Sequence, residues 1–157
     1  MNKREYAQAN RTSSESRDEF AQSMPSRNRG RAQLNRAWIE AKAQEEGVKA
    51  LSKGIYYKVL SEGRNDGRHP SPRSIVTAHY TGWTINGKKF DSSRGGAPLA
   101  IRLCDLIEGW IIAMQQMCVG DKWEVYIPAE MGYGKFSQPG IPGGSTLIFE
   151  IELLGIA

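Results

Sequence analysis

Residues 106–134 constrain the fold most strongly, because a helical apolar pattern passes there directly into an alternating strand pattern. The helical part is marked by apolar residues three or four positions apart: Leu106, Ile107, Trp110, Ile111, Met114 and Met117. After a Gly120-Asp121 turn, the strand part alternates Trp123, Val125 and Ile127 with Lys122, Glu124 and Tyr126. Together they predict a short helix packed on a half-buried sheet. Gly109 allows the backbone to approach closely, so Trp110 is either ordinary core or the floor of a site.

The remaining apolar patterns predict more strands and few helices. Strands are expected over 54–60, 74–81, 99–103 and 146–154, each with alternating or β-branched residues. An Asn86-Gly87 pair predicts a tight hairpin, Asp105 is placed to cap the helix, and a long glycine- and proline-rich loop spans 129–145. The predicted fold class is therefore α+β, with an antiparallel, twisted sheet of about five strands wrapped on one short helix.

The N-terminal part differs from the rest in charge. Residues 1–36 hold eight Lys/Arg and four Asp/Glu, whereas residues 37–157 hold thirteen of each. We predict a basic, largely disordered tail over 1–30, with a short helix from Ser14 to Met24, and an N-terminal helix over 31–47 that ends at Gly47. That helix is expected to pack lightly on the domain or on a partner. A solvated tail is favoured over a nucleic-acid-binding arm.

Several function classes lack the residues that they need. The sequence has no Gly-x-Ser-x-Gly elbow that would mark a nucleophilic serine. Its two histidines, His69 and His79, lie far in sequence from Cys104 and Cys118, so no cysteine–histidine pair is indicated. No metal-ligand cluster and no dinucleotide fingerprint occur, so neither a metal nor a cofactor is expected. No apolar run is long enough to span a membrane. Since no secretory signal is recognised, reduced thiols and a cytoplasmic location are expected.

A set of short motifs remains, and its order is specific. The motifs are His79-Tyr80-Thr81-Gly82, Asn86-Gly87-x-x-Phe90-Asp91-Ser92-Ser93, Leu106-Ile107-x-Gly109-Trp110, Ile127-Pro128-x-x-x-Gly132-Tyr133-Gly134, Ile141-Pro142, and Leu147-x-Phe149-x-Ile151-Glu152-Leu153-Leu154. Over residues 54–156 this order resembles the FKBP-type peptidyl-prolyl cis-trans isomerases. The lead-in from Glu45 to Leu60 looks like the bacterial macrophage infectivity potentiator (Mip) branch, in which a helix enters the domain at this point.

The resemblance implies an FKBP-type isomerase domain over 48–157 that accelerates rotation about X–Pro bonds without covalent or acid–base catalysis. It assigns catalytic roles to Tyr80, Asp91 and Tyr133, and makes Trp110 the floor of an apolar proline pocket open beside Tyr133 and Phe149. The other substrate-binding residues that it implies are Phe90, Leu99, Leu106, Ile107, Ile141 and Phe149. Ile107 would offer a backbone N–H, and the Tyr133 hydroxyl would bond a substrate carbonyl.

The implied partners are proline-containing polypeptides and macrolides of the tacrolimus and rapamycin type. One departure from the family pattern is a loop between Ser93 and Pro98 that is one residue shorter than usual, which removes Arg94 from its usual place beside Asp91. A binding or chaperone module with little turnover is the alternative function. A monomer is expected, with a dimer through the N-terminal helix as the alternative.

Overall fold

The computed structural model describes residues 26–157, with side chains from residue 29 onward. Its long elements are α2 (Ser26–Lys42), α3 (Glu108–Met114), β2 (Tyr56–Ser61), β3 (Ile75–Trp83), β6 (Lys122–Ile127) and β7 (Leu147–Ile156). Its short elements are β1 (Val48–Ala50), β4 (Lys89–Ser92), β5 (Leu99–Arg102) and the 3₁₀ turns η2 (Ser52–Gly54), η3 (Leu103–Asp105) and η4 (Ala129–Met131). No helix within residues 26–157 has the length and apolarity needed to cross a lipid bilayer.

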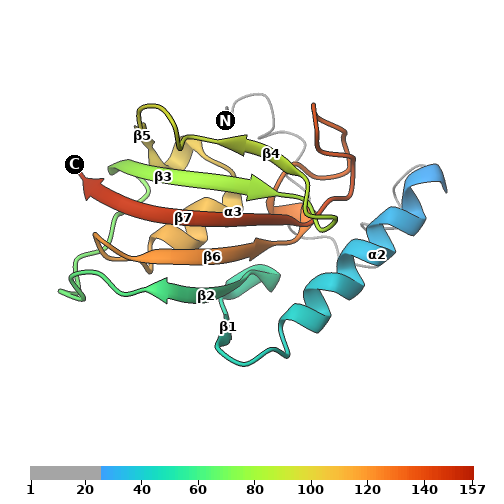
Figure 1. The fold of residues 1–157 in the computed structure, drawn as a ribbon, viewed down its shortest axis with the longest axis horizontal. Coiled ribbons are helices and arrows are strands. Elements are labelled where there is room, and N and C mark those ends of the chain that lie inside the picture. The colour runs from blue at the N-terminus through green and yellow to red at the C-terminus, as the bar shows by residue number, and fades with distance from the viewer. Residues whose placement is uncertain (1–25) are drawn as a thin grey trace.

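One antiparallel sheet organises the domain, and α3 lies across one of its faces (Figure 1). The strand order is β1-β2-β6-β7-β3-β4, and β5 pairs with β3 off this path. The sheet has seven strands where about five were expected, because β1 and β4, of three and four residues, were not counted as separate strands. The predicted fold class is confirmed: it is α+β, with an antiparallel sheet against one short helix.

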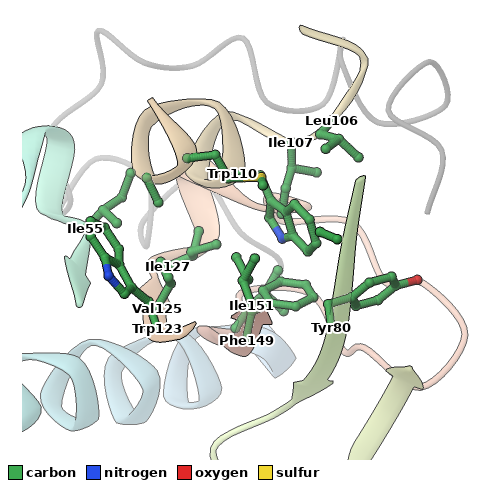
Figure 2. Close-up of a cluster of buried hydrophobic side chains, with 14 of the residues drawn as sticks. Ile55, Tyr80, Leu106, Ile107, Trp110, Trp123, Val125, Ile127, Phe149 and Ile151 are labelled. Atoms are coloured by element: carbon green, nitrogen blue, oxygen red, sulfur yellow. The ribbon is translucent and has the colours of Figure 1, made fainter. Parts of the chain in front are cut away.

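The core lies between α3 and the sheet face that the alternating patterns predicted. On β7 every second side chain is completely buried: Leu147, Phe149, Ile151 and Leu153. Trp110 and Met114 of α3 are also completely buried and close the core from the helix side (Figure 2). Because each such side chain contributes roughly 1.5–3 kcal/mol through burial, this layer fixes α3 on the sheet.

Helix α3 is shorter than its apolar pattern suggested, and it is not capped by Asp105. Asp105 ends the preceding turn η3, and Ile107 holds the N-cap position without a side-chain cap. Gly109 explains the close packing, because a Cβ there would lie 2.5 Å from Cδ1 of Ile127 on β6. The glycine therefore lets the helix backbone rest on the sheet.

The predicted hairpin is confirmed between β3 and β4. Gly87 has φ +82°, a conformation that suits glycine, and its N–H donates to the carbonyl of Thr84 over 3.0 Å. The amide oxygen of Asn86 accepts a bond from the Lys88 N–H at 3.1 Å. This turn brings Phe90 back alongside β3.

Helix α2 begins at Ser26, inside the segment expected to be a disordered tail, and ends at Lys42 rather than 47. The prediction for residues 26–30 is therefore wrong, while the predicted helix from Ser14 to Met24 lies outside the described residues. Ile39 of α2 is 1% exposed, and the ring of Trp38 meets that of Tyr126 on β6 edge to face, 5.9 Å between centroids. The helix therefore packs on the domain, as one of the two predicted alternatives, through a few buried side chains.

Candidate functional site

Four aromatic rings from four different elements meet at the centre of the candidate site. Tyr80 of β3 and Phe149 of β7 each pack nearly perpendicular or tilted to their neighbours around Trp110 of α3 (Figure 2). The ring centroids of Trp110 lie 5.2 Å from those of Tyr80 and 5.3 Å from those of Phe149, both at 82°. Phe90 of β4 adds an edge-to-face contact with Phe149 at 5.5 Å. Such perpendicular pairs place the positive ring edge on a negative ring face, which holds each ring in one orientation.

Gly82 makes this aromatic cluster possible, and the sequence analysis assigned it no role. A Cβ at Gly82 would lie 2.5 Å from Cζ of Phe90 and 2.8 Å from Cε1 of Phe149. Both distances are far below van der Waals contact, so only glycine leaves room for the two rings. Gly82 is the last residue of the motif that contains Tyr80. The need for glycine there comes from Phe90 and Phe149, which lie further along the chain, so the motif alone does not explain it.

The one carboxylate of the candidate site is held by Tyr80. The Tyr80 hydroxyl donates a hydrogen bond to Oδ2 of Asp91 over 2.7 Å, and the Ser92 N–H donates to Oδ1 over 2.9 Å. Burial raises the pKa of Tyr80 above its ordinary value, and so do the hydrogen bond to Asp91 and the charge of that carboxylate. Tyr80 therefore stays protonated throughout the neutral range and donates a hydrogen bond to Asp91 without transferring its proton.

Strand β4 is held in place by serine hydroxyls next to this pair. Ser93 Oγ accepts a bond from the Tyr80 N–H over 2.9 Å, and the Ser93 N–H donates to the Tyr80 carbonyl over the same distance. His79 Nδ1 also lies 2.9 Å from Ser93 Oγ. These bonds fix the side chain of Asp91 relative to β3, so the geometry of the candidate site is set by backbone pairing.

Arg94 does not accompany Asp91, in agreement with the expectation from the shortened loop. Its guanidinium lies 2.9 Å from Oε1 of Glu152 and 3.6 Å from Oε1 of Glu150, both on β7. The structure thus assigns Arg94 to exposed ion pairs on the outer face of the sheet.

All the predicted apolar residues belong to one cluster. The completely or almost completely buried members are Tyr80, Leu106, Ile107, Trp110, Tyr133, Ile141 and Phe149, and Phe90 and Leu99 pack against them partly exposed. Tyr133 and Ile141 are each 6% exposed, whereas Trp110 and Phe149 have no exposed surface. The predicted opening beside Tyr133 and Phe149 is therefore closed in this structure.

Trp110 carries a polar group that is not satisfied. Among the described side chains, its Nε1 is the one buried nitrogen or oxygen atom without a hydrogen-bond partner. An unpaired buried donor costs about 1–3 kcal/mol, and N–H groups that face aromatic rings recover part of that cost. The indole itself lies between the rings of Tyr80 and Phe149.

A histidine and a cysteine that lie far apart in sequence meet away from the candidate site. His69 Nδ1 lies 2.9 Å from the carbonyl oxygen of Met117 and 3.8 Å from Sγ of Cys118. A carbonyl only accepts, so Nδ1 carries the proton and cannot take one from the thiol. Asp121 accepts from the N–H groups of Gly63 and Cys118 over 2.7 and 2.8 Å. The cluster therefore anchors a loop, and within residues 26–157 no three His, Cys, Asp or Glu side chains could hold a metal ion.

Comparison with known proteins agrees with this geometry. A model described as "FKBP-type peptidyl-prolyl cis-trans isomerase" matches residues 66–154. The isomerase FkpA of Escherichia coli is 42% identical over 115 residues, which is 73% of this chain and 42% of FkpA. The isomerase Mip of Coxiella burnetii is 39% identical over 127 residues, 80% of this chain and 54% of Mip. The chain thus spans about half the length of these relatives.

A solved structure extends the likeness to the whole domain. The crystal structure of a peptidyl-prolyl cis-trans isomerase from Pseudomonas syringae is 32% identical, with a TM-score of 0.76, over 83% of this chain and 96% of that one.

Proposed function

Because the chain belongs to the family of FKBP-type peptidyl-prolyl cis-trans isomerases, we propose that it accelerates the rotation of X–Pro bonds in polypeptides. The observation that carries the proposal is the convergence of Tyr80, Trp110 and Phe149 beside the Tyr80–Asp91 hydrogen bond. Proline-containing segments would be its substrates, and macrolides of the tacrolimus and rapamycin type would compete for the same cluster.

The reaction needs no nucleophile and no cofactor. Rotation about an X–Pro bond takes tens to hundreds of seconds unaided, over a barrier of ~18–20 kcal/mol that reflects lost amide resonance. A twisted amide has a less polar carbonyl than a planar one, so an apolar, water-free environment favours the twisted form. Lowering the barrier by about 5 kcal/mol accelerates exchange several thousandfold, since ~1.4 kcal/mol corresponds to tenfold.

Each residue of the cluster has a proposed task. The indole of Trp110 is the floor on which the proline ring rests, and Phe90, Leu99, Leu106, Ile107, Ile141 and Phe149 are the walls. The Ile107 N–H and the Tyr133 hydroxyl bond carbonyl groups of the substrate on either side of the proline. Asp91 keeps the Tyr80 ring in its orientation, a task that the 2.7 Å hydrogen bond supports.

Access to the cluster has to be part of the mechanism. Since Trp110 and Phe149 are completely buried, the proposed catalytic cycle begins with an opening step, and exclusion of water follows when the cover closes again. The alternative function is a module that captures proline-containing segments with little turnover. Such a module would suppress aggregation of unfolded proteins whether or not the cluster is altered.

A protease-coupled assay on a short proline peptide tests the proposal. We expect the wild type to accelerate isomerisation, tacrolimus to inhibit it, and Tyr133→Phe to lower kcat/KM about tenfold through the loss of one hydrogen bond. Tyr57→Phe is the matched control, because the Tyr57 ring stacks on Trp123 at 4.1 Å, outside the aromatic cluster. No acceleration at micromolar protein would reject an isomerase, and suppressed aggregation would then favour the capture module.

Three sequence predictions stay predictions. Gel filtration distinguishes the expected monomer from a dimer through α2. Deletion of residues 1–36, which hold the excess of positive charge, with salt-dependent binding measurements tests whether the N-terminal part binds nucleic acid. Fractionation of cells that express the protein tests the expected cytoplasmic location.

A further inference from the structure

A groove is lined by residues of α2, of the β3–β4 turn and of the loop before β7. These three segments lie on the same side of the molecule (Figure 1). The volume of the groove is about 810 Å³. Leu34 of α2 forms one side, Ile85 and Lys88 of the β3–β4 turn form the other, and Ile141 and Pro142 lie between them. Leu34 is 68% exposed, so its apolar side chain is available at this groove.

The groove adjoins the proposed proline site through a shared wall. Ile141 lines the groove and also belongs to the buried cluster around Trp110. The segment that carries it is a tight loop, because Gln138 and Ile141 exchange two backbone hydrogen bonds of 2.8 Å. At Gly140 a Cβ would lie 3.4 Å from Cβ of Phe90, so this loop packs directly on the aromatic cluster.

The α2 side of the groove is a fixed part of the domain. Asn35 is 5% exposed, and its Oδ1 accepts a hydrogen bond from the N–H of Thr146 over 2.8 Å. The Thr146 hydroxyl donates to the Asn35 carbonyl over 3.2 Å. A wall held by buried hydrogen bonds keeps its position when the groove is empty, so less conformational freedom is lost on binding.

The lining combines apolar surface with positive charge. Among its described residues there are two basic side chains, Arg31 and Lys88, and no carboxylate. Lys88 is exposed. Such a surface complements an extended segment that carries both acidic and apolar side chains.

We propose that this groove binds the part of a substrate polypeptide that flanks the proline, and that it selects acidic and apolar flanks. The inference rests on the proposed function, since it extends the same site from the proline ring to its neighbours in sequence. Two other occupants fit the groove less well. Residues 1–25 hold four Lys/Arg and four Asp/Glu, so they lack a net negative charge. A second copy of this chain would bring its own groove, which is also positive.

Fluorescence anisotropy with labelled peptides tests the proposal. Three peptides share one central proline and differ in flanks of Glu and Leu, of Lys and Leu, or of Ser and Gly. We expect the Glu/Leu peptide to bind the full chain about three- to tenfold more tightly than the Lys/Leu peptide. Added salt should narrow that difference. Equal affinities for all three peptides would overturn the proposal.

Two variants place the effect in the groove. Lys88→Glu should abolish or reverse the preference for Glu over Lys flanks. Leu34→Gln should instead lower the affinity for the Glu/Leu peptide and for the Lys/Leu peptide equally, by about threefold. Lys89→Glu is the matched control, because it makes the same change of charge at an exposed neighbour that does not line the groove. An equal response of Lys88→Glu and Lys89→Glu would contradict a specific groove.

The same set of measurements separates this inference from the proposed function. If the wild type accelerates isomerisation of a short peptide but shows no flank preference among the longer peptides, the isomerase function is supported and the groove proposal is rejected. Affinity that rises when residues 1–25 are deleted would make that segment the occupant and overturn the proposal. Peptide binding that falls as protein concentration rises would make a second copy the occupant, with the same consequence.

Discussion

The Tyr80 hydroxyl donates a 2.7 Å hydrogen bond to Oδ2 of Asp91, and this bond joins β3 to β4 beside a fully buried indole. A second phenol–carboxylate hydrogen bond, of comparable length, lies on β6, where the Tyr126 hydroxyl donates to Oε1 of Glu124 over 2.6 Å. The molecule therefore contains two equivalent bonds, one in the candidate site and one outside it, which allows a role in stability to be separated from a role in activity.

Replacing each tyrosine by phenylalanine makes this comparison. Tyr80→Phe and Tyr126→Phe should each lower the free energy of unfolding by about 1–3 kcal/mol, since each removes a hydrogen bond to a charged group. Only Tyr80→Phe should also lower kcat/KM for a short proline peptide, by about tenfold. Urea unfolding and the coupled assay measure the two effects. Equal activity of the two variants would show that the Tyr80–Asp91 bond is structural.

The same two tyrosines predict how stability depends on alkaline pH. Burial raises the pKa of Tyr80 and of Tyr126 above the ordinary value near 10, and the hydrogen-bonded carboxylates Asp91 and Glu124 raise them further. Both groups thus contribute stability that is complete below pH ~10 and is lost as pH rises toward the folded-state pKa. The urea midpoint should fall above pH ~10, and less steeply in the double variant Tyr80→Phe/Tyr126→Phe. Parallel curves for the two proteins would contradict this assignment.

Gly82 should tolerate no side chain. Gly82→Ala places a methyl group within 2.8 Å of the Phe90 and Phe149 rings, and such overpacking costs about 1–3 kcal/mol. Gly155→Ala on β7 is the control, because the nearest atom to its Cβ is 3.9 Å away. Thermal unfolding should separate the two variants, and adding Phe90→Leu should restore part of the stability of Gly82→Ala.

Asn35 should hold α2 to the domain. Asn35→Ala leaves the buried N–H of Thr146 unpaired, which costs about 1–3 kcal/mol. Gln33→Ala on the exposed side of the same helix should change stability by less than about 0.5 kcal/mol. Hydrogen exchange within α2 gives a direct readout, since its amides should exchange faster in Asn35→Ala only.

Arg94 should matter little for catalysis. Its partners Glu150 and Glu152 form exposed ion pairs on the outer sheet face, and such pairs contribute about 0–1 kcal/mol. Arg94→Ala should therefore leave kcat/KM unchanged while Asp91→Ala reduces it. A comparable loss of activity in both variants would mean that Arg94 acts on Asp91 during turnover.

The sequence predicted the parts of this molecule whose signals are local. Alternation identified β6 and β7 because one face of each strand is buried, and Asn86-Gly87 identified the hairpin because the turn needs a positive φ. Strand β1 was missed because its three residues, Val48–Ala50, are too few for a pattern and owe their pairing to β2.

The candidate site was predicted as a set of residues but not as a geometry. Motif order grouped Tyr80, Asp91 and Trp110, and the structure brings them together through strand pairing and helix packing. The need for glycine at 82 and the bond between Asn35 and Thr146 depend on contacts between distant segments. The complete burial of Trp110 also depends on contacts between distant segments, so no local sequence pattern predicts it.

The attachment of α2 changes where this chain can be shortened. A version starting at residue 48, the predicted domain boundary, would remove the partner of Thr146 immediately ahead of β7 and uncover Tyr126, which meets Trp38. The smallest autonomous unit therefore includes α2, which begins at Ser26. Tags, fusions and truncation libraries for this protein are best joined upstream of that residue.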